Sequence, residues 1–184
     1  IPIDATVIMY TGALISNKGI SFLIDAIPLV LQRESKAHFV IAGSPIDTLA
    51  PYLSTPLFRE RVTVISPLSY FELPVILSMA NIGVDPKEAE VKQASGKLLQ
   101  YMGAGLPVAC FDTRNNREYL GEGGFYATTV SATGLSEVLI DMIRHLDECA
   151  RQGIENRIRV ERFSWAKSAL RLEKVYSRIL MREM

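Results

Sequence analysis

The sequence has 184 residues, 48% of them hydrophobic and 22% charged, and its 20 Lys and Arg residues balance its 20 Asp and Glu residues. This composition excludes a disordered tail, a collagen-like repeat and a disulfide-rich scaffold. The charge is unevenly distributed: residues 1–150 carry 11 basic and 16 acidic side chains, whereas residues 151–184 carry 9 basic and 4 acidic ones. Because nucleic-acid-binding domains usually have a basic body, the acidic body argues against a nucleic-acid partner.

The two cysteines, Cys110 and Cys149, set no disulfide framework and have no zinc-ligand spacing. We expect both to be small buried residues in a reducing, cytoplasmic setting. No apolar run approaches the roughly 20 residues that a membrane-spanning helix needs. The opening IPIDATVIMYTG lacks the charged start of a signal peptide and leads almost directly into a strand. We therefore expect the chain to be a fragment of a longer protein.

Short apolar segments alternate with amphipathic ones along most of the chain. Buried strands are predicted at residues 6–11, 37–42, 62–65, 82–84 and 107–111. Helices are predicted at residues 18–34, 47–58, 70–79, 95–103, 135–152 and 164–184. This order predicts an α/β fold, a Rossmann-like parallel sheet sandwiched by helices, followed by a helical C-terminal tail. Without a linker or repeat, residues 1–184 are expected to form one domain, with residues 164–184 as a terminal amphipathic helix.

The turn before the helix at residues 95–103 is the most informative candidate site, because parallel sheets bind ligands at the carboxyl ends of their strands. Ser95 suits the N-cap position, Gly96 lets a ligand approach the backbone, and Lys97 adds a positive charge. Together with the free N–H groups of the helix, these residues predict an anion site, most plausibly for phosphate. A capped helix with a solvated lysine fits the same pattern.

The turn after the first strand repeats this arrangement. Gly12 ends the strand, and Lys18 and Gly19 precede the next helix, so Lys18 is expected near Lys97 at the same edge of the sheet. The alternative is a surface lysine in a tight turn. Neither turn has the spacing of a dinucleotide-binding or P-loop motif, which counts against hydride transfer and ATP hydrolysis.

Two further loops follow strands. The loop from Asp85 to Glu90 is rich in carboxylates, which could orient the hydroxyls of a sugar, although a solvated surface loop also fits. Residues 112–118 are expected to begin a helix capped by Asn115 or Asn116. No His, Cys and Asp cluster has metal-ligand spacing and no nucleophile elbow occurs, so no metal site or hydrolytic nucleophile is predicted.

Five stretches of the sequence, in this order, resemble the C-terminal, donor-binding half of retaining GT-B-fold glycosyltransferases of family 4 (glycosyl transferases group 1). They are YTGALISNKGISFLIDAI, HFVIAGSP, SPLSYFELPVILSMANIGVDP, SGKLLQYMGAGLPVACFDTRNNREYL and RFSWAKSALRLEKVYSRIL. The resemblance implies a hexosyltransferase that uses a UDP-sugar or GDP-sugar in polysaccharide biosynthesis, without another cofactor and with retention of configuration. It also implies an N-terminal acceptor-binding domain before Ile1, so that this chain alone binds the donor without turnover. The resemblance places the enzyme in the cytoplasm, or at a membrane surface that carries a lipid-linked acceptor.

The resemblance assigns roles to individual residues. Lys18 and Lys97 would contact the donor diphosphate, and Gln100 would hold the ribose hydroxyls. The loops around the diphosphate would contain Gly12, Ser95 and Gly96, and the loops that flank the nucleobase would contain Gly43, Ser44, Ser66, Pro67 and Leu68.

Three positions depart from the family pattern. Ala13 stands where an arginine is frequent, and Lys92 and Gln100 stand where the family has a pair of glutamates. Glu88 or Glu90 would then supply the carboxylate near the transferred sugar. These departures leave two alternatives open: a catalytically degenerate nucleotide-sugar-binding or scaffolding domain, and one half of a sugar-nucleotide epimerase.

The terminal helix is expected to be amphipathic. Its apolar stripe comprises Trp165, Ala169, Leu172, Tyr176 and Ile179, and its basic face comprises Arg171, Lys174, Arg178 and Arg182. A solvated helix face, a contact with the N-terminal domain and a contact with anionic lipid are all consistent with this pattern.

Overall fold

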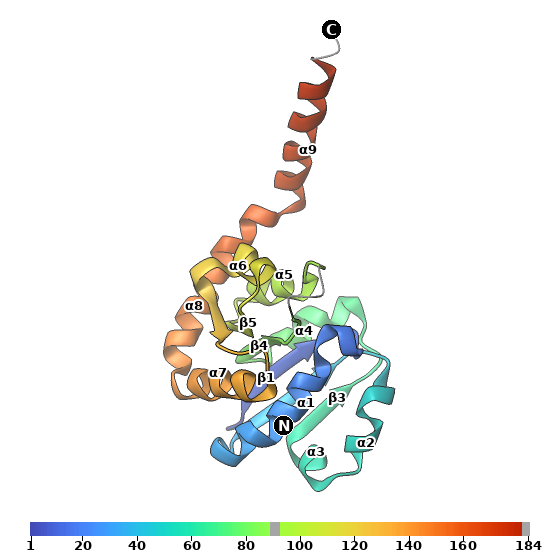
Figure 1. Ribbon diagram of the computed structural model, residues 1–184, viewed down its shortest axis with the longest axis vertical. Coiled ribbons are helices and arrows are strands. Elements are labelled where there is room, and N and C mark those ends of the chain that lie inside the picture. Colours follow the sequence, from blue (N-terminus) through green and yellow to red (C-terminus); the bar gives the residue numbers. More distant parts are fainter. Residues whose placement is uncertain (89–92, 182–184) are drawn as a thin grey trace.

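The computed structural model describes residues 1–88 and 93–181. A six-stranded parallel sheet lies at its centre, with helices on both faces (Figure 1). The strands are β1 (Thr6–Thr11), β2 (Ala37–Ala42), β3 (Val62–Ile65), β4 (Ile82–Asp85), β5 (Val108–Phe111) and β6 (Gly124–Ala127). The helices are α1 (Ile20–Arg33), α2 (Ala50–Leu53), α3 (Pro56–Arg61), α4 (Leu73–Leu77), α5 (Gly96–Gly103), α6 (Arg114–Leu120), α7 (Ala132–Arg144), α8 (Leu146–Val160) and α9 (Trp165–Leu180). The predicted α/β fold class is therefore confirmed.

In the strand order β3-β2-β1-β4-β5-β6, the direction in which strands are added to the sheet reverses between β1 and β4. From β1 the chain first builds the sheet outward through β2 and β3, and then returns to the other side of β1 to add β4, β5 and β6. The loops that follow β1 and β4 therefore leave the sheet in opposite directions. Such a switch point opens a crevice at the carboxyl ends of the two strands.

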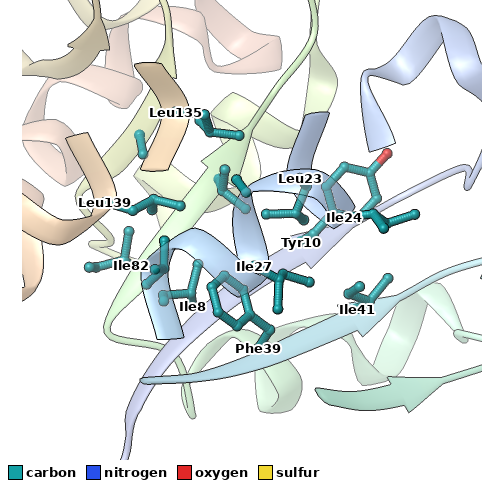
Figure 2. Packing of buried hydrophobic residues seen from close by; sticks show 14 of the residues in the cluster. Ile8, Tyr10, Leu23, Ile24, Ile27, Phe39, Ile41, Ile82, Leu135 and Leu139 are labelled. Carbon is teal, nitrogen blue, oxygen red and sulfur yellow. The ribbon is translucent and has the colours of Figure 1, made fainter. Parts of the chain in front are cut away.

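The strands are apolar on both faces because helices cover both. Alternate side chains of a strand point to opposite faces, so Ile8 and Tyr10 face one side while Val7 and Met9 face the other. Helices α1 and α7 pack on the first face, where Figure 2 shows Ile27 of α1 and Leu139 of α7 among the strand side chains. Helices α4, α5 and α6 pack on the second face. The predicted burial of Cys110 and Cys149 is confirmed, and both are free thiols.

The five predicted strands are confirmed, and the structure adds a sixth that was not predicted: β6 continues the sheet beside β5. This strand has four residues, begins at Gly124 and lies at the sheet edge, where Phe125 and Tyr126 are only half-buried. Its sequence therefore lacks the long apolar run of β1 and β2.

Two helix predictions were also corrected. The predicted helix at residues 135–152 is broken at His145 into α7, which packs on α1, and α8, which packs on α5. The predicted helix at residues 47–58 is divided at Thr55, whose side chain accepts the N–H of Phe58 and caps α3, while Pro56 occupies the first turn. Helix α6 is capped by Thr113 rather than by Asn115 or Asn116.

Helix α9 projects away from the rest of the molecule (Figure 1), and none of its residues is buried. The Ser164 side chain caps it by accepting the N–H of Lys167. The Trp165 side of the helix is exposed along its length, with Trp165 itself 91% exposed. The predicted basic residue Arg182 lies outside the described residues. Within the described part of the chain, no helix is long and apolar enough to cross a membrane.

Candidate functional site

The switch point holds a pocket of about 210 Å³ between the ends of β1 and β4 and the start of α5. The residues that line it are Thr11, Gly12, Ala13, Lys18, Lys87, Ala94, Ser95, Gly96, Lys97 and Gln100. Six residues that the sequence predicted as contacts of the diphosphate and ribose are thus brought together: Gly12, Lys18, Ser95, Gly96, Lys97 and Gln100. Two segments supply them, and Lys18 of the first is 77 positions before Ser95 of the second. The parallel sheet brings both segments to one edge.

Lys97 is a nearly buried cation of the pocket. Its side chain is 10% exposed, and its Nζ lies 3.6 Å from Asp85 Oδ1 and 3.6 Å from the centroid of the Tyr10 ring. Burial lowers the pKa of Lys97 to about 8, although Asp85 opposes that shift. Among the described residues Nζ has no hydrogen-bond acceptor. Because a buried ammonium without an acceptor is costly, an anion in this pocket would be stabilised.

Two further lysines face the same pocket and are held by one residue. Lys18 Nζ donates a hydrogen bond to Gln93 Oε1 at 2.6 Å, and Lys87 Nζ donates to the backbone carbonyl of Gln93. Lys87 is only 4% exposed, and burial lowers its pKa. The pocket is therefore lined by three lysines, and Asp85 is the carboxylate beside them.

Lys87 was not predicted as a site residue, because the pattern of this loop pointed to its carboxylates. The signal was present: Lys87 lies two residues after a buried strand, at the same edge of the sheet as Lys18 and Lys97. Gly19 allows the first turn to contact the backbone of Pro86 and Lys87. A Cβ atom at Gly19, whose φ is +73°, would lie 2.0 Å from the Pro86 carbonyl oxygen.

The expectation that Asp85 helps to orient sugar hydroxyls was wrong. Asp85 is the last residue of β4, and its side chain is fully buried beneath Lys97. Glu88 is half-buried and is not one of the described residues that line the pocket. Glu90 and Lys92 lie outside the described residues.

The turns after β1, β2 and β3 lie side by side. Gly12 N–H donates to the Ala42 carbonyl at 2.9 Å, Leu14 N–H donates to the Ser44 carbonyl at 3.0 Å, and Gly43 N–H donates to the Ile65 carbonyl at 2.9 Å. The residues predicted to flank a nucleobase therefore border the first turn at Gly43 and Ser44. The segment of Ser66, Pro67 and Leu68 follows β3. This strand lies one position farther from β1 and β4 than β2 does.

Ser95 occupies the N-cap position of α5, as predicted, but its side chain makes no capping hydrogen bond in the described structure. The Leu98 N–H instead donates to the Ser95 backbone carbonyl at 3.1 Å. The first N–H groups of a helix have no partner within the helix, so the start of α5 presents donors and the positive end of its dipole to the pocket.

Tyr101 joins α5 to the end of β1. The Thr11 backbone N–H donates to the Tyr101 hydroxyl at 2.8 Å, and this ring is fully buried. Gly83 makes room for the ring, since a Cβ atom there would lie 2.7 Å from Tyr101 Cδ2. The contact fixes α5 relative to the end of β1, which Gly12 follows.

We expect Tyr101→Phe to lower the free energy of unfolding by about 1–3 kcal/mol, because the buried Thr11 N–H would lose its acceptor. Urea unfolding followed by circular dichroism measures the change. Tyr119→Phe is the matched control, since the Tyr119 side chain is half-buried and packs against Phe163. Equal effects of the two substitutions would contradict the role of the Tyr101 hydroxyl.

A larger hollow of about 370 Å³ adjoins the lysine pocket. It is lined by residues of α4, α5 and the preceding turn, with Gln100 shared between the two hollows and Arg157 contributed by α8. Its walls are mainly apolar, with Leu73 and Leu77 among them. The lysines converge on the smaller hollow, so the anion site belongs there.

The family model described as glycosyl transferases group 1 matches residues 5–145, which is more than three quarters of the chain. The chain belongs to this glycosyltransferase family. The match includes the loops after all six strands and therefore the whole lysine pocket.

This glycosyltransferase chain is 24% identical over 122 residues to alpha-D-kanosaminyltransferase of Streptomyces kanamyceticus, a match that covers 65% of the chain and 31% of that enzyme. The chain thus spans about a third of the length of the curated relative it matches. Its fold is that of sucrose-phosphate synthase from Thermosynechococcus elongatus (TM-score 0.81, 21% identity, 99% of this chain and 47% of that one). It is also that of Anabaena Alr3699/HepE, solved in complex with UDP-glucose (TM-score 0.77, 17% identity, 95% and 49%). The catalytic domain of cholesterol-alpha-glucosyltransferase from Helicobacter pylori has the same fold (TM-score 0.71, 18% identity, 86% and 99%).

Proposed function

We propose that this glycosyltransferase chain is a donor-binding domain that holds a nucleoside-diphosphate sugar, UDP- or GDP-linked, at the switch point of the sheet. One observation carries the proposal: Lys18, Lys87 and Lys97 converge with the start of α5 on one pocket. Lysine ammonium groups and helix N–H groups together suit a diphosphate. The complex of Anabaena Alr3699/HepE with UDP-glucose supports a sugar nucleotide as the ligand class.

The proposed ligand extends from the lysine pocket in two directions. The nucleobase lies toward Gly43 and Ser44, which border the first turn, and toward the segment from Ser66 to Leu68, which follows β3. Gln100 lines the pocket and holds the ribose hydroxyls through its side-chain amide. The sugar lies toward the loop that carries Glu88 and Glu90, whose carboxylates orient its hydroxyls.

The lysines act on the leaving group in the proposed reaction. As the bond between the anomeric carbon and the diphosphate oxygen breaks, negative charge grows on the diphosphate, and Lys18, Lys87 and Lys97 stabilise it without a metal cofactor. The acceptor oxygen forms the new bond on the same face of the sugar, with retention, and its proton passes to a base. We assign that base and the acceptor site to an N-terminal domain of the full-length enzyme, so that residues 1–184 bind the donor without turnover.

Isothermal titration of UDP, GDP and their glucose conjugates tests this proposal. We expect Lys97→Ala to weaken donor binding by about tenfold or more, because a hydrogen bond to a charged group contributes about 1.5–3 kcal/mol. Lys36→Ala is the matched control, since Lys36 pairs with Asp4 at the opposite end of the sheet and is exposed. Absent heats with the wild type, or equal affinities of the wild type and Lys97→Ala, would refute the assignment.

A further inference from the structure

The carboxylate of Asp85 is unusual in its surroundings. It is fully buried at the end of β4, and neither of its oxygens has a hydrogen-bond partner in the described structure. Its neighbours in the sheet are apolar: Val84 precedes it, and Cys110 of β5 lies opposite. The group that compensates it is the Lys97 ammonium at 3.6 Å. A carboxylate is costly to bury, so its presence beneath an anion site needs a physical reason.

We propose that Asp85 is a positioning residue for the donor diphosphate: its buried carboxylate holds the Lys97 ammonium in the pocket and keeps it charged. This inference rests on the proposed function. A carboxylate repels a bound diphosphate, because both groups are negatively charged. Asp85 therefore cannot favour donor binding by direct contact. Its effect must pass through Lys97, whose Nζ lies between the carboxylate and the pocket.

The groups around Lys97 act on its charge in opposite directions. Burial lowers the pKa of Lys97 most, Asp85 raises it, and the neighbouring lysines lower it. The charged and titratable groups that face it are Asp85 of β4, Lys87 of the following loop, Lys18 of the first turn and Tyr10 of β1. Burial raises the pKa of Tyr10, so this phenol is neutral wherever Lys97 titrates.

Without Asp85, burial and the two neighbouring lysines, Lys18 and Lys87, all favour the neutral amine of Lys97. The pKa of Lys97 would then fall below about 8, and Lys97 would lose its charge near neutral pH. A lysine is charged below its pKa, so donor binding should decrease as pH rises through that value. Loss of Asp85 should therefore move the decrease to lower pH rather than weaken binding equally at every pH.

The experiment compares the wild type, Asp85→Asn, Lys97→Met and the double variant. UDP affinity is measured by calorimetry between about pH 6 and 9, and the ε-carbon resonance of Lys97 is followed by NMR over the same range. Lys97→Met assigns the resonance. We expect Asp85→Asn to bind UDP like the wild type at the acid end and about tenfold more weakly near pH 8. The Lys97 resonance should titrate at lower pH in this variant.

The double variant keeps the test valid if Asp85→Asn alone folds poorly, because it removes both members of the buried pair. If Asp85 acts through Lys97, adding Asp85→Asn to Lys97→Met should leave UDP affinity at about pH 8 unchanged or raise it. A further loss in the double variant, or an unshifted Lys97 resonance in Asp85→Asn, would overturn the inference. The NMR titration needs no ligand, so a wild type that fails to bind UDP would refute the proposed function alone.

Discussion

Alanine in place of Gly43 should lower the free energy of unfolding by about 3 kcal/mol or more and abolish UDP binding. Gly43 has a φ of +156°, and a Cβ atom there would lie 1.8 Å from the Gly12 carbonyl oxygen. The Cβ position is set by the Gly43 backbone, and the atom it meets is itself backbone, so no side-chain rotation can relieve the clash. The turn after β2 would have to separate from the turn after β1, which contributes Gly12 to the lysine pocket.

Urea unfolding and UDP calorimetry measure the two effects of Gly43→Ala. Gly103→Ala is the matched control, because Gly103 is helical and a Cβ atom there meets nothing within 4 Å. It should change stability by less than about 1 kcal/mol, since alanine favours helix over glycine. A Gly43→Ala variant that is as stable as the wild type and binds UDP would show that the two turns do not approach each other as described.

The second large effect is expected from removing Lys18 and Lys87 together. The double variant Lys18→Met/Lys87→Met should bind UDP and inorganic pyrophosphate about 100-fold more weakly, because each charged hydrogen bond contributes about 1.5–3 kcal/mol and 1.4 kcal/mol is tenfold. Both ammonium groups face the pocket and are held by Gln93. Methionine retains the length of the apolar stem while removing the charge.

Calorimetry with pyrophosphate isolates the diphosphate contribution from contacts of the base and sugar. Lys36→Met/Lys167→Met removes the same number of charges from exposed positions, one paired with Asp4 and one on α9. This control should bind pyrophosphate like the wild type. If both double variants lose affinity to the same extent, the effect is one of net charge, and the pocket has no specific role.

The sequence predicted the parts of the fold that depend on local pattern. The inner strands are continuous apolar runs because helices cover both faces of the sheet, and the wide apolar stripe of α1 follows the helical period. Lys18 and Lys97 were predicted to lie together because both follow parallel strands, and strand ends meet at one edge.

The features that sequence reasoning missed depend on contacts distant in sequence. Asp85 and Lys87 lie in a polar run that is typical of a solvated loop, and only Lys97, Gly19 and Gln93 explain their burial. Helix α8 does not continue the direction of α7 but packs on α5, where Gly153 lies against the Gly105 carbonyl. No local pattern indicates this contact. Tertiary contacts of this kind override local preference and have no signal within a single segment.

The exposure of α9 has a thermodynamic consequence. Isolated helices near 12–15 residues are marginal in water, and most helical stability in proteins comes from packing. The 16 residues of α9 bury none of their side chains in the described structure, so their order rests on backbone hydrogen bonds and the Ser164 cap. Amide hydrogens of α9 should therefore exchange with solvent far faster than those of α1 or α7. Any surface that covers the Trp165 side of the helix must also offset the entropy of ordering it, so that contact and helix formation become one coupled equilibrium.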